Sequence, residues 1–173
     1  MQLTDLNPTH DIGANCLLVE MGPFRFIFDC GMHPKKAGRA ALPALTKLAD
    51  DSVDFILVTH SHLDHIGGLT VAARHQRDCP IFVTAPTQLL LPRMLRNSVG
   101  VMLRQRDELN MNELPLFTHG EVERLEDRLR PLAFGRPFIF EKNDDRLEIT
   151  FFPAGHVAGA AGARVVHQKE RVF

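Results

Sequence analysis

The run His60-Ser61-His62-Leu63-Asp64-His65 decides how this chain folds around a site, because it gathers three histidines and one aspartate within six positions. It directly follows residues 53–59 (VDFILVT), a nearly continuous β-branched and apolar run that is typical of a strand buried on both faces. Gly67-Gly68 comes next, and glycine permits a close approach of backbone. We therefore expect a buried strand that delivers the polar run into a loop, and a helix that begins near Asp64 or His65.

The chemistry of this run indicates a metal site. Residues two apart in an extended segment point to the same side, so His60 and His62 can reach one ion. Asp64 and His65 lie at the turn into the helix and can face the same cavity from another side. Imidazole nitrogen suits zinc, and a carboxylate also admits manganese or iron. A lone histidine is usually a solvated or hydrogen-bonded residue, but this density in this setting predicts metal binding.

A third imidazole is needed to close such a site, and His156 is the best candidate. It lies in the small-residue run 153–162, directly after an expected strand at 147–152, and small side chains let backbone crowd close to an ion. The other histidines fit other roles: His75 and His167 are expected in solvent, while His10, His33 and His119 lie in loops and could line a cleft.

Composition restricts the class of protein. The 173 residues form most simply one domain, residues 1–173, and 45% hydrophobic with 24% charged residues allows an ordinary core. The formal net charge of −1 gives no bulk attraction for nucleic acid. No apolar stretch reaches the length of a membrane span, so we expect no membrane association and a cytoplasmic location. Cys16, Cys30 and Cys79 form no CxxC pattern and are expected to be buried free thiols.

The pattern along the chain predicts layered α and β structure. Residues 15–20 and 24–29 indicate a β-hairpin across Met21-Gly22-Pro23, and Thr118 with Glu121 fits a capping box. Further strands are expected at 80–84, 138–140, 147–152 and 163–167, and the chain reaches Phe173 within what looks like a new strand. Helices are expected at 39–49, at about 64–75, and after Thr118 with Val122, Leu125 and Leu129 on one face. Residues 87–109 are expected to form one kinked helix or two helices, because Pro92 and Gly100 interrupt the helical pattern.

The HxHxDH run resembles the second motif of the metallo-β-lactamase superfamily, and His156 resembles its third-motif histidine. Asp29, which ends the run Phe26-Ile27-Phe28, looks like the first-motif aspartate. Cys30-Gly31-Met32-His33 and Ala154-Gly155-His156-Val157 are similar to the β-CASP nucleases, the branch that includes the endonuclease of mRNA 3′-end cleavage. The resemblance implies an αββα sandwich and a role in RNA processing.

Carried to this chain, the resemblance implies that His60, His62 and His156 hold one zinc and that Asp64 and His65 contribute to a second. Asp29 is expected to orient a ligand histidine by hydrogen bonding. A zinc-activated hydroxide would attack phosphorus, which makes the chain a metal-dependent hydrolase, with RNA as its expected substrate and DNA as the alternative.

The sequence also departs from the family. The fourth-motif aspartate would fall beyond Phe173, and the β-CASP cap is missing, so we expect a sandwich that is incomplete at its C-terminus. Either the chain is truncated, or a homo-oligomer or a partner chain completes the site. We expect one tightly bound metal at most, with weak nuclease activity or none.

Two other functions compete with the nuclease. A small-molecule hydrolase of a thioester, lactone or amide keeps the metals but needs an apolar pocket. A non-catalytic metal-binding or scaffold module fits the abrupt end, but the candidate ligands are intact. Arg93, Arg96, Arg104 and Arg106 could contact phosphates, although a solvated charged face is the simpler interpretation.

Overall fold

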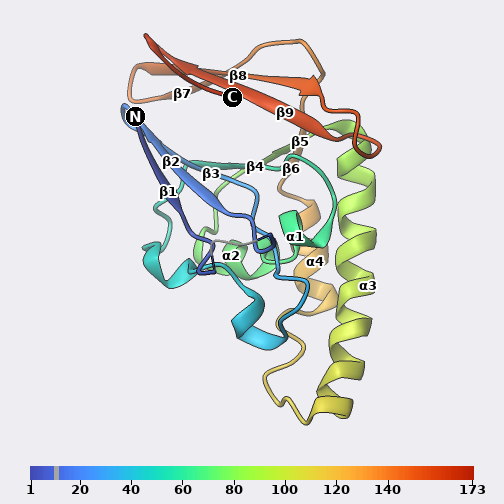
Figure 1. The fold of residues 1–173 in the computed structure, drawn as a ribbon. Helices are drawn as coiled ribbons and strands as arrows, with labels where there is room; N and C mark the ends of the chain where they lie inside the picture. Colours follow the sequence, from blue (N-terminus) through green and yellow to red (C-terminus); the bar gives the residue numbers. More distant parts are fainter. Residues whose placement is uncertain (10–11) are drawn as a thin grey trace.

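The structure is a computed structural model that describes residues 1–9 and 12–173, and it stacks two β-sheets face to face with helices outside the larger sheet (Figure 1). The larger sheet has the strand order β1-β2-β3-β4-β5-β6. Its strands are β1 (Gln2–Asp5), β2 (Leu17–Met21), β3 (Phe24–Phe28), β4 (Phe55–Leu57), β5 (Ile81–Val83) and β6 (Leu129–Pro131). The smaller sheet has the order β10-β9-β8-β7, with β7 (Phe138–Lys142), β8 (Asp145–Pro153), β9 (Ala161–His167) and β10 (Glu170–Val172).

The direction of the strands places candidate site residues at one edge of the larger sheet. β2 and β3 form the predicted antiparallel hairpin, whereas β3, β4, β5 and β6 run parallel. Every residue of β4 is buried, as expected for a strand covered on both faces. Because parallel strands end at the same edge, Asp29 after β3 and His60 after β4 become neighbours.

Two hydrophobic cores hold the layers together. An aromatic core fills the space between the sheets, where the rings of Phe26 and Phe55 stack with centroids 4.7 Å apart. Leu147, Ile149 and Phe151 of β8 meet these rings from the other sheet, because alternate residues of a strand point the same way. A second core of aliphatic side chains lies between the larger sheet and the helices.

The four helices all cover the face of the larger sheet that the smaller sheet leaves free (Figure 1). They are α1 (Leu63–Ile66), α2 (Leu69–His75), α3 (Ala85–Leu109) and α4 (His119–Glu126), and none of the described residues forms a helix that is long and apolar enough to cross a membrane. α, β and β layers are thus present, in agreement with the predicted α/β class and αββα-type sandwich.

Two helix predictions were wrong in detail. The helix expected at 64–75 divides at Gly67-Gly68 into α1 and α2, because the Gly68 N–H donates to Cys30 O (2.8 Å) and the Asp64 carbonyl accepts from the Asn15 N–H (3.0 Å) instead of pairing with each other. Residues 87–109 lie in one continuous helix that includes Pro92, so the alternative of two helices was wrong. Its buried side chains recur every three or four residues and pack on the core, which holds the helix through the proline.

Two other expected helical segments also changed. The helix expected at 39–49 is a pair of short 3-10 turns, η1 (Gly38–Ala41) and η2 (Leu45–Lys47), separated at Pro43. Leu129, expected on the last helix, belongs to β6, while the capping box of Thr118 and Glu121 is confirmed. All three cysteines are free and buried, as predicted.

Candidate metal centre

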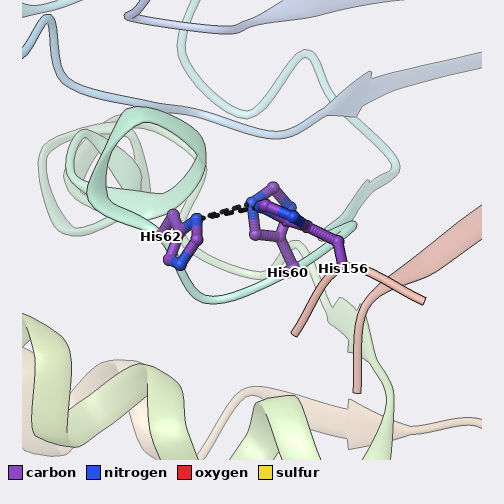
Figure 2. Close-up of side chains that lie close together, drawn as sticks. All are labelled: His60, His62 and His156. Carbon is purple, nitrogen blue, oxygen red and sulfur yellow. Dashed lines mark hydrogen bonds between the residues drawn. The ribbon is translucent and has the colours of Figure 1, made fainter. Parts of the chain in front are cut away.

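Three imidazoles converge at the edge where the two sheets meet. His60 and His62 lie in the loop after β4, and His156 lies in the loop between β8 and β9 (Figure 2). His62 Nδ1 is 3.2 Å from His60 Nε2 and 3.2 Å from His156 Nε2. Zinc–nitrogen bonds of about 2.0–2.1 Å in a tetrahedron place nitrogens about 3.4 Å apart, so both of these distances are compatible with ligands of one zinc ion. Among the described residues, these three histidines are the one group whose donor atoms all lie within 4.8 Å of one another.

The environment keeps His60 in the neutral form that a metal requires. Burial, and after it repulsion from the neighbouring His65, lowers the pKa of His60 to about 4 against the opposing charge of Asp29. His60 is 8% exposed, whereas His156 lies in solvent. The centre is therefore closed on the side of the strands and open on the side of the β8–β9 loop.

Asp29 organises the buried side of the centre. Its φ of 56° is unusual for a residue other than glycine, and three hydrogen bonds hold its carboxylate in place. It accepts from the backbone N–H of Thr59 (2.8 Å), from the hydroxyl of Thr59 (2.8 Å) and from Nδ1 of His65 (2.7 Å). A proton held on Nδ1 leaves Nε2 of His65 as the nitrogen that can accept a hydrogen bond or bind an ion.

Asp64 and His65 lie beside the three histidines rather than among them. The ring centroids of His65 and His60 are 4.0 Å apart, and Asp64 Oδ2 is 3.5 Å from His65 Nε2. Burial lowers the pKa of His65, but the hydrogen bond and charge of Asp29, with the charge of Asp64, raise it by more. This pair offers a second, more weakly formed position for an ion.

Two residues at this centre escaped the sequence analysis. Thr59 Oγ1 lies 3.1 Å from His60 Nδ1 and, because its own hydrogen goes to Asp29, it accepts the proton that fixes the tautomer of His60. Asn15 donates its amide to the backbone carbonyl of Asp64 (3.0 Å) and lies 3.1 Å from His65 Nε2. The signal for Thr59 was its place between the buried strand and His60, while nothing in sequence links Asn15 to Asp64.

Glycines do bring backbone together here, at positions that partly differ from those expected. A Cβ on Gly67 would stand 2.5 Å from Met32 Cβ, so the predicted close approach is confirmed, with a neighbouring segment as the partner. In the β8–β9 loop, a Cβ on Gly155 would meet nothing within 4 Å, whereas one on Gly159 would press on Thr84 and Thr87.

The other histidines lie away from this group of three. His75 is exposed and pairs with Asp50, and His119 is exposed at the start of α4. His33 is buried and accepts from the backbone N–H of Lys35 (3.1 Å), while His10 lies outside the described residues.

The prediction for His167 was wrong. It is 5% exposed, because the β9–β10 hairpin folds its ring edge-on against Phe24, where Nε2 pairs with Asp145 at 2.9 Å.

Two of the four arginines proposed for phosphate contact form ion pairs with acidic side chains. Arg96 pairs with Glu126 and Arg106 with Asp107, whereas Arg93 and Arg104 are exposed.

Comparison with known proteins adds sequence relatives. Integrator complex subunit 11 from Danio rerio is 28% identical over 99% of this chain, and this chain covers 28% of that protein. Cleavage and polyadenylation specificity factor subunit 3 from Dictyostelium discoideum is 27% identical over 93% of the chain, which covers 20% of it. The chain thus spans about a quarter of the length of these relatives, whose names bear out the predicted likeness to mRNA 3′-end cleavage proteins.

Solved structures share the fold. A dizinc quorum-quenching lactonase superposes with a TM-score of 0.55 at 18% identity, covering 91% of this chain and 54% of that one. An archaeal metallo-β-lactamase superfamily protein from Sulfolobus tokodaii also gives 0.55 at 15% identity, with coverage of 96% and 60%. The model of the metallo-beta-lactamase superfamily domain matches residues 18–173. The chain therefore belongs to the metallo-β-lactamase superfamily.

Proposed function

We propose that this chain is a metal-dependent hydrolase domain of the phosphodiesterase type that acts on RNA. The convergence of His60 Nε2, His62 Nδ1 and His156 Nε2 at zinc-ligand spacing carries the proposal. The likeness to a cleavage and polyadenylation factor supports RNA over DNA as the substrate. The buried free thiols are typical of a reducing compartment and support a cytoplasmic location.

Each residue of the centre has a proposed task. His60, His62 and His156 hold zinc, with manganese or iron as alternatives, and Asp64 with His65 contributes to a second position. Zinc bound there would supply a Lewis acid and lower the pKa of a bound water to about 7. Asp29 keeps the proton of His65 on Nδ1, and the carboxylate of Asp64, 30% exposed, accepts a proton from the attacking water.

We propose that residues 1–173 form one metallo-β-lactamase-type domain. Donors beyond Asp64 and His65, from another segment or from another chain, would complete the second metal position. Since Asp64 and His65 supply only two donors there, we expect one tightly held ion per chain and weak turnover.

The competing small-molecule hydrolase needs an apolar pocket at the metal. A cavity of about 850 Å³ does exist, but it lies on the helical side, lined by residues such as Leu45, Val71 and Pro115, and includes none of the three histidines. The outer edge of the centre is instead open at His156, which suits a long polymer substrate.

Metal analysis followed by a cleavage assay tests the proposal. After equilibrium dialysis against zinc, the chain should retain one ion, His62→Ala should retain none, and His75→Ala, an exposed histidine outside the centre, should match the original chain. Single-turnover incubation with labelled single-stranded RNA should give slow cleavage that a chelator stops. Zinc retention by His62→Ala would overturn the metal centre, and hydrolysis of a lactone or thioester with intact RNA would overturn the substrate.

A further inference from the structure

Two buried threonines form hydrogen bonds with the loop that carries His156. Thr84, the N-cap of α3, and Thr87 in its first turn are 1% and 0% exposed. The Thr84 hydroxyl donates to the backbone carbonyl of Gly159 at 2.7 Å, and the Thr87 hydroxyl reaches the same oxygen at 3.2 Å. The start of α3 and the β8–β9 loop, more than 70 residues apart in sequence, are thereby joined by two hydroxyls.

The contact between the β8–β9 loop and the start of α3 requires a glycine at position 159. Gly159 has a φ of +83°, and a Cβ there would stand 2.7–2.8 Å from Thr84 Oγ1, Thr87 N and Thr87 Oγ1. Real Cβ atoms do not come so close, so the loop can seat on α3 only without a side chain at this position. Gly155, at the other end of the loop, also has a positive φ (+70°) but meets nothing within 4 Å.

The loop passes this restraint on to His156. The Ala160 N–H donates to Val157 O (2.9 Å), the Ala154 N–H donates to Ala160 O (2.9 Å), and the Ala161 N–H donates to Thr59 O (2.8 Å). His156 is itself exposed, so burial does not hold its imidazole in place. Its position at the other two histidines therefore depends on how the ends of the loop are fixed.

We propose that Thr84 and Thr87 are positioning residues, whose hydroxyls hold the β8–β9 loop so that His156 stands at metal-binding distance from His60 and His62. The inference rests on the proposed metal centre. A ligand on a free loop must be ordered when the ion binds, and the threonines supply that order in advance. Thr84 also accepts from the Thr87 backbone N–H at 3.4 Å, so the helix cap and the loop anchor are one unit.

The first test replaces Thr87 by valine, which keeps the shape and removes the hydroxyl. The control is Thr150→Val in β8, because the buried Thr150 hydroxyl has no hydrogen-bond partner in the part of the chain that the structure describes. We expect Thr87→Val to weaken zinc binding about tenfold, measured by chelator competition, as for other residues that orient ligands. Cobalt absorption should change shape, Thr87→Ser should restore both readouts, and Thr150→Val should leave both unchanged.

A second pair of variants leaves the hydroxyls intact. Gly159→Ala forces the loop off α3, whereas Gly155→Ala imposes a similar backbone strain in open space. Gly159→Ala should weaken cobalt binding more than Gly155→Ala does. In the metal-free protein, amide hydrogen exchange across residues 154–160 should accelerate in Thr87→Val and Gly159→Ala, with the exchange of β8 unchanged.

The outcomes separate the two proposals. If the original chain binds neither zinc nor cobalt, the metal centre fails, while hydrogen exchange still tests whether the threonines hold the loop. If the original chain binds metal and Thr87→Val binds it equally, with the same cobalt spectrum and the same loop exchange, the role of the threonines is overturned.

Discussion

Replacing Asp29 by asparagine should move a proton on His65. The carboxylate, 7% exposed, accepts from His65 Nδ1 at 2.7 Å and from the Thr59 hydroxyl at 2.8 Å through one oxygen, Oδ2. If an amide nitrogen takes the place of that oxygen, it donates instead of accepting. His65 must then accept at Nδ1 and carry its proton on Nε2, the nitrogen that would otherwise face an ion.

The size of the effect follows from the contacts. A hydrogen bond to a charged group contributes about 1.5–3 kcal/mol, and the buried site gives little solvent screening, so Asp29→Asn should destabilise the metal-free protein by roughly that amount. Burial alone lowers the pKa of His65, and Asp29, together with the smaller effect of Asp64, more than reverses this. Without the carboxylate, the pKa should fall from above 6.5 to below it.

The pH dependence has a definite sign. A raised folded pKa at His65 stabilises the protein fully below pH 6.5, and this stabilisation is lost as the pH rises through the folded pKa. Asp29→Asn removes it, so the free-energy difference between the two proteins in urea unfolding should be larger at about pH 5.5 than at about pH 8.

Imidazole nitrogen NMR reads the tautomer directly. The matched control is Asp145→Asn, which removes the partly exposed carboxylate that pairs with the buried His167 outside the centre. It should lower stability while His65 keeps its Nδ1 proton. Zinc affinity at the three-histidine position should change less than at the second position, where loss of an orienting partner costs about 10–100-fold. A His65 that keeps its Nδ1 proton and its raised pKa in Asp29→Asn would refute this reasoning.

Three further predictions concern the rest of the fold. Burial, and after it His65, lowers the pKa of His60 to about 4, so the folded metal-free protein binds a proton at His60 less readily than the unfolded chain does. The free energy of unfolding, measured in urea, should therefore fall by about 3 kcal/mol as the pH falls from 6.5 to 4. A free energy of unfolding that stays constant over this pH range would contradict the prediction. The hydrogen bond from Arg74, and then Thr118, lowers the pKa of Glu121 to about 2, so Glu121→Ala should cost about 1–3 kcal/mol at neutral pH. That cost should shrink as the pH falls from 4.5 towards 2, and the exposed Glu123→Ala should change stability by under about 0.5 kcal/mol. Gly31→Ala would place a Cβ 1.7 Å from the Asp64 carbonyl and should destabilise by about 3 kcal/mol or more, while Gly162→Ala, with nothing within 4 Å, should be nearly neutral in thermal melts.

The secondary-structure elements that could be predicted from sequence are those whose signals lie within a few neighbouring residues. Residues 53–59 were identified as a buried strand because their apolar character needs no distant partner to be recognised, and the capping box at Thr118 is complete within four residues. His156 could be proposed with His60 and His62 because a metal site needs a third imidazole and His156 follows an expected strand in a run of small residues. Their spacing of 3.2 Å, in contrast, is set by the stacking of two sheets, which no local pattern encodes.

The errors arose where tertiary contacts overrode local preference. Pro92 disfavours a helix interior, yet the packed side chains Leu91, Leu95 and Val99 keep α3 continuous across it. His167 near the chain end looked solvated, but the pairing of β9 with β10 buries it against Phe24. Thr84 was placed at the end of the expected strand at 80–84 and Thr87 at the start of the expected helix at 87–109, and only the fold shows that both hydroxyls contact the Gly159 carbonyl.

The placement of the ligands couples metal binding to the docking of the two sheets. His60 and His62 follow β4 of the larger sheet, whereas His156 follows β8 of the smaller one, so a bound ion links the sheets at one edge. The aromatic core around Phe26 and Phe55 fixes the distance between the two sheets. The hydrogen bond from the Ala161 N–H to the Thr59 carbonyl fixes the same distance next to the histidines. A ligand that binds only the folded state stabilises it by about 2.7 kcal/mol at 100 times its dissociation constant. Since that stabilisation is gained only when both sheets are in place, residues of the inter-sheet core and residues of the β8–β9 loop contribute to the same metal affinity by different routes.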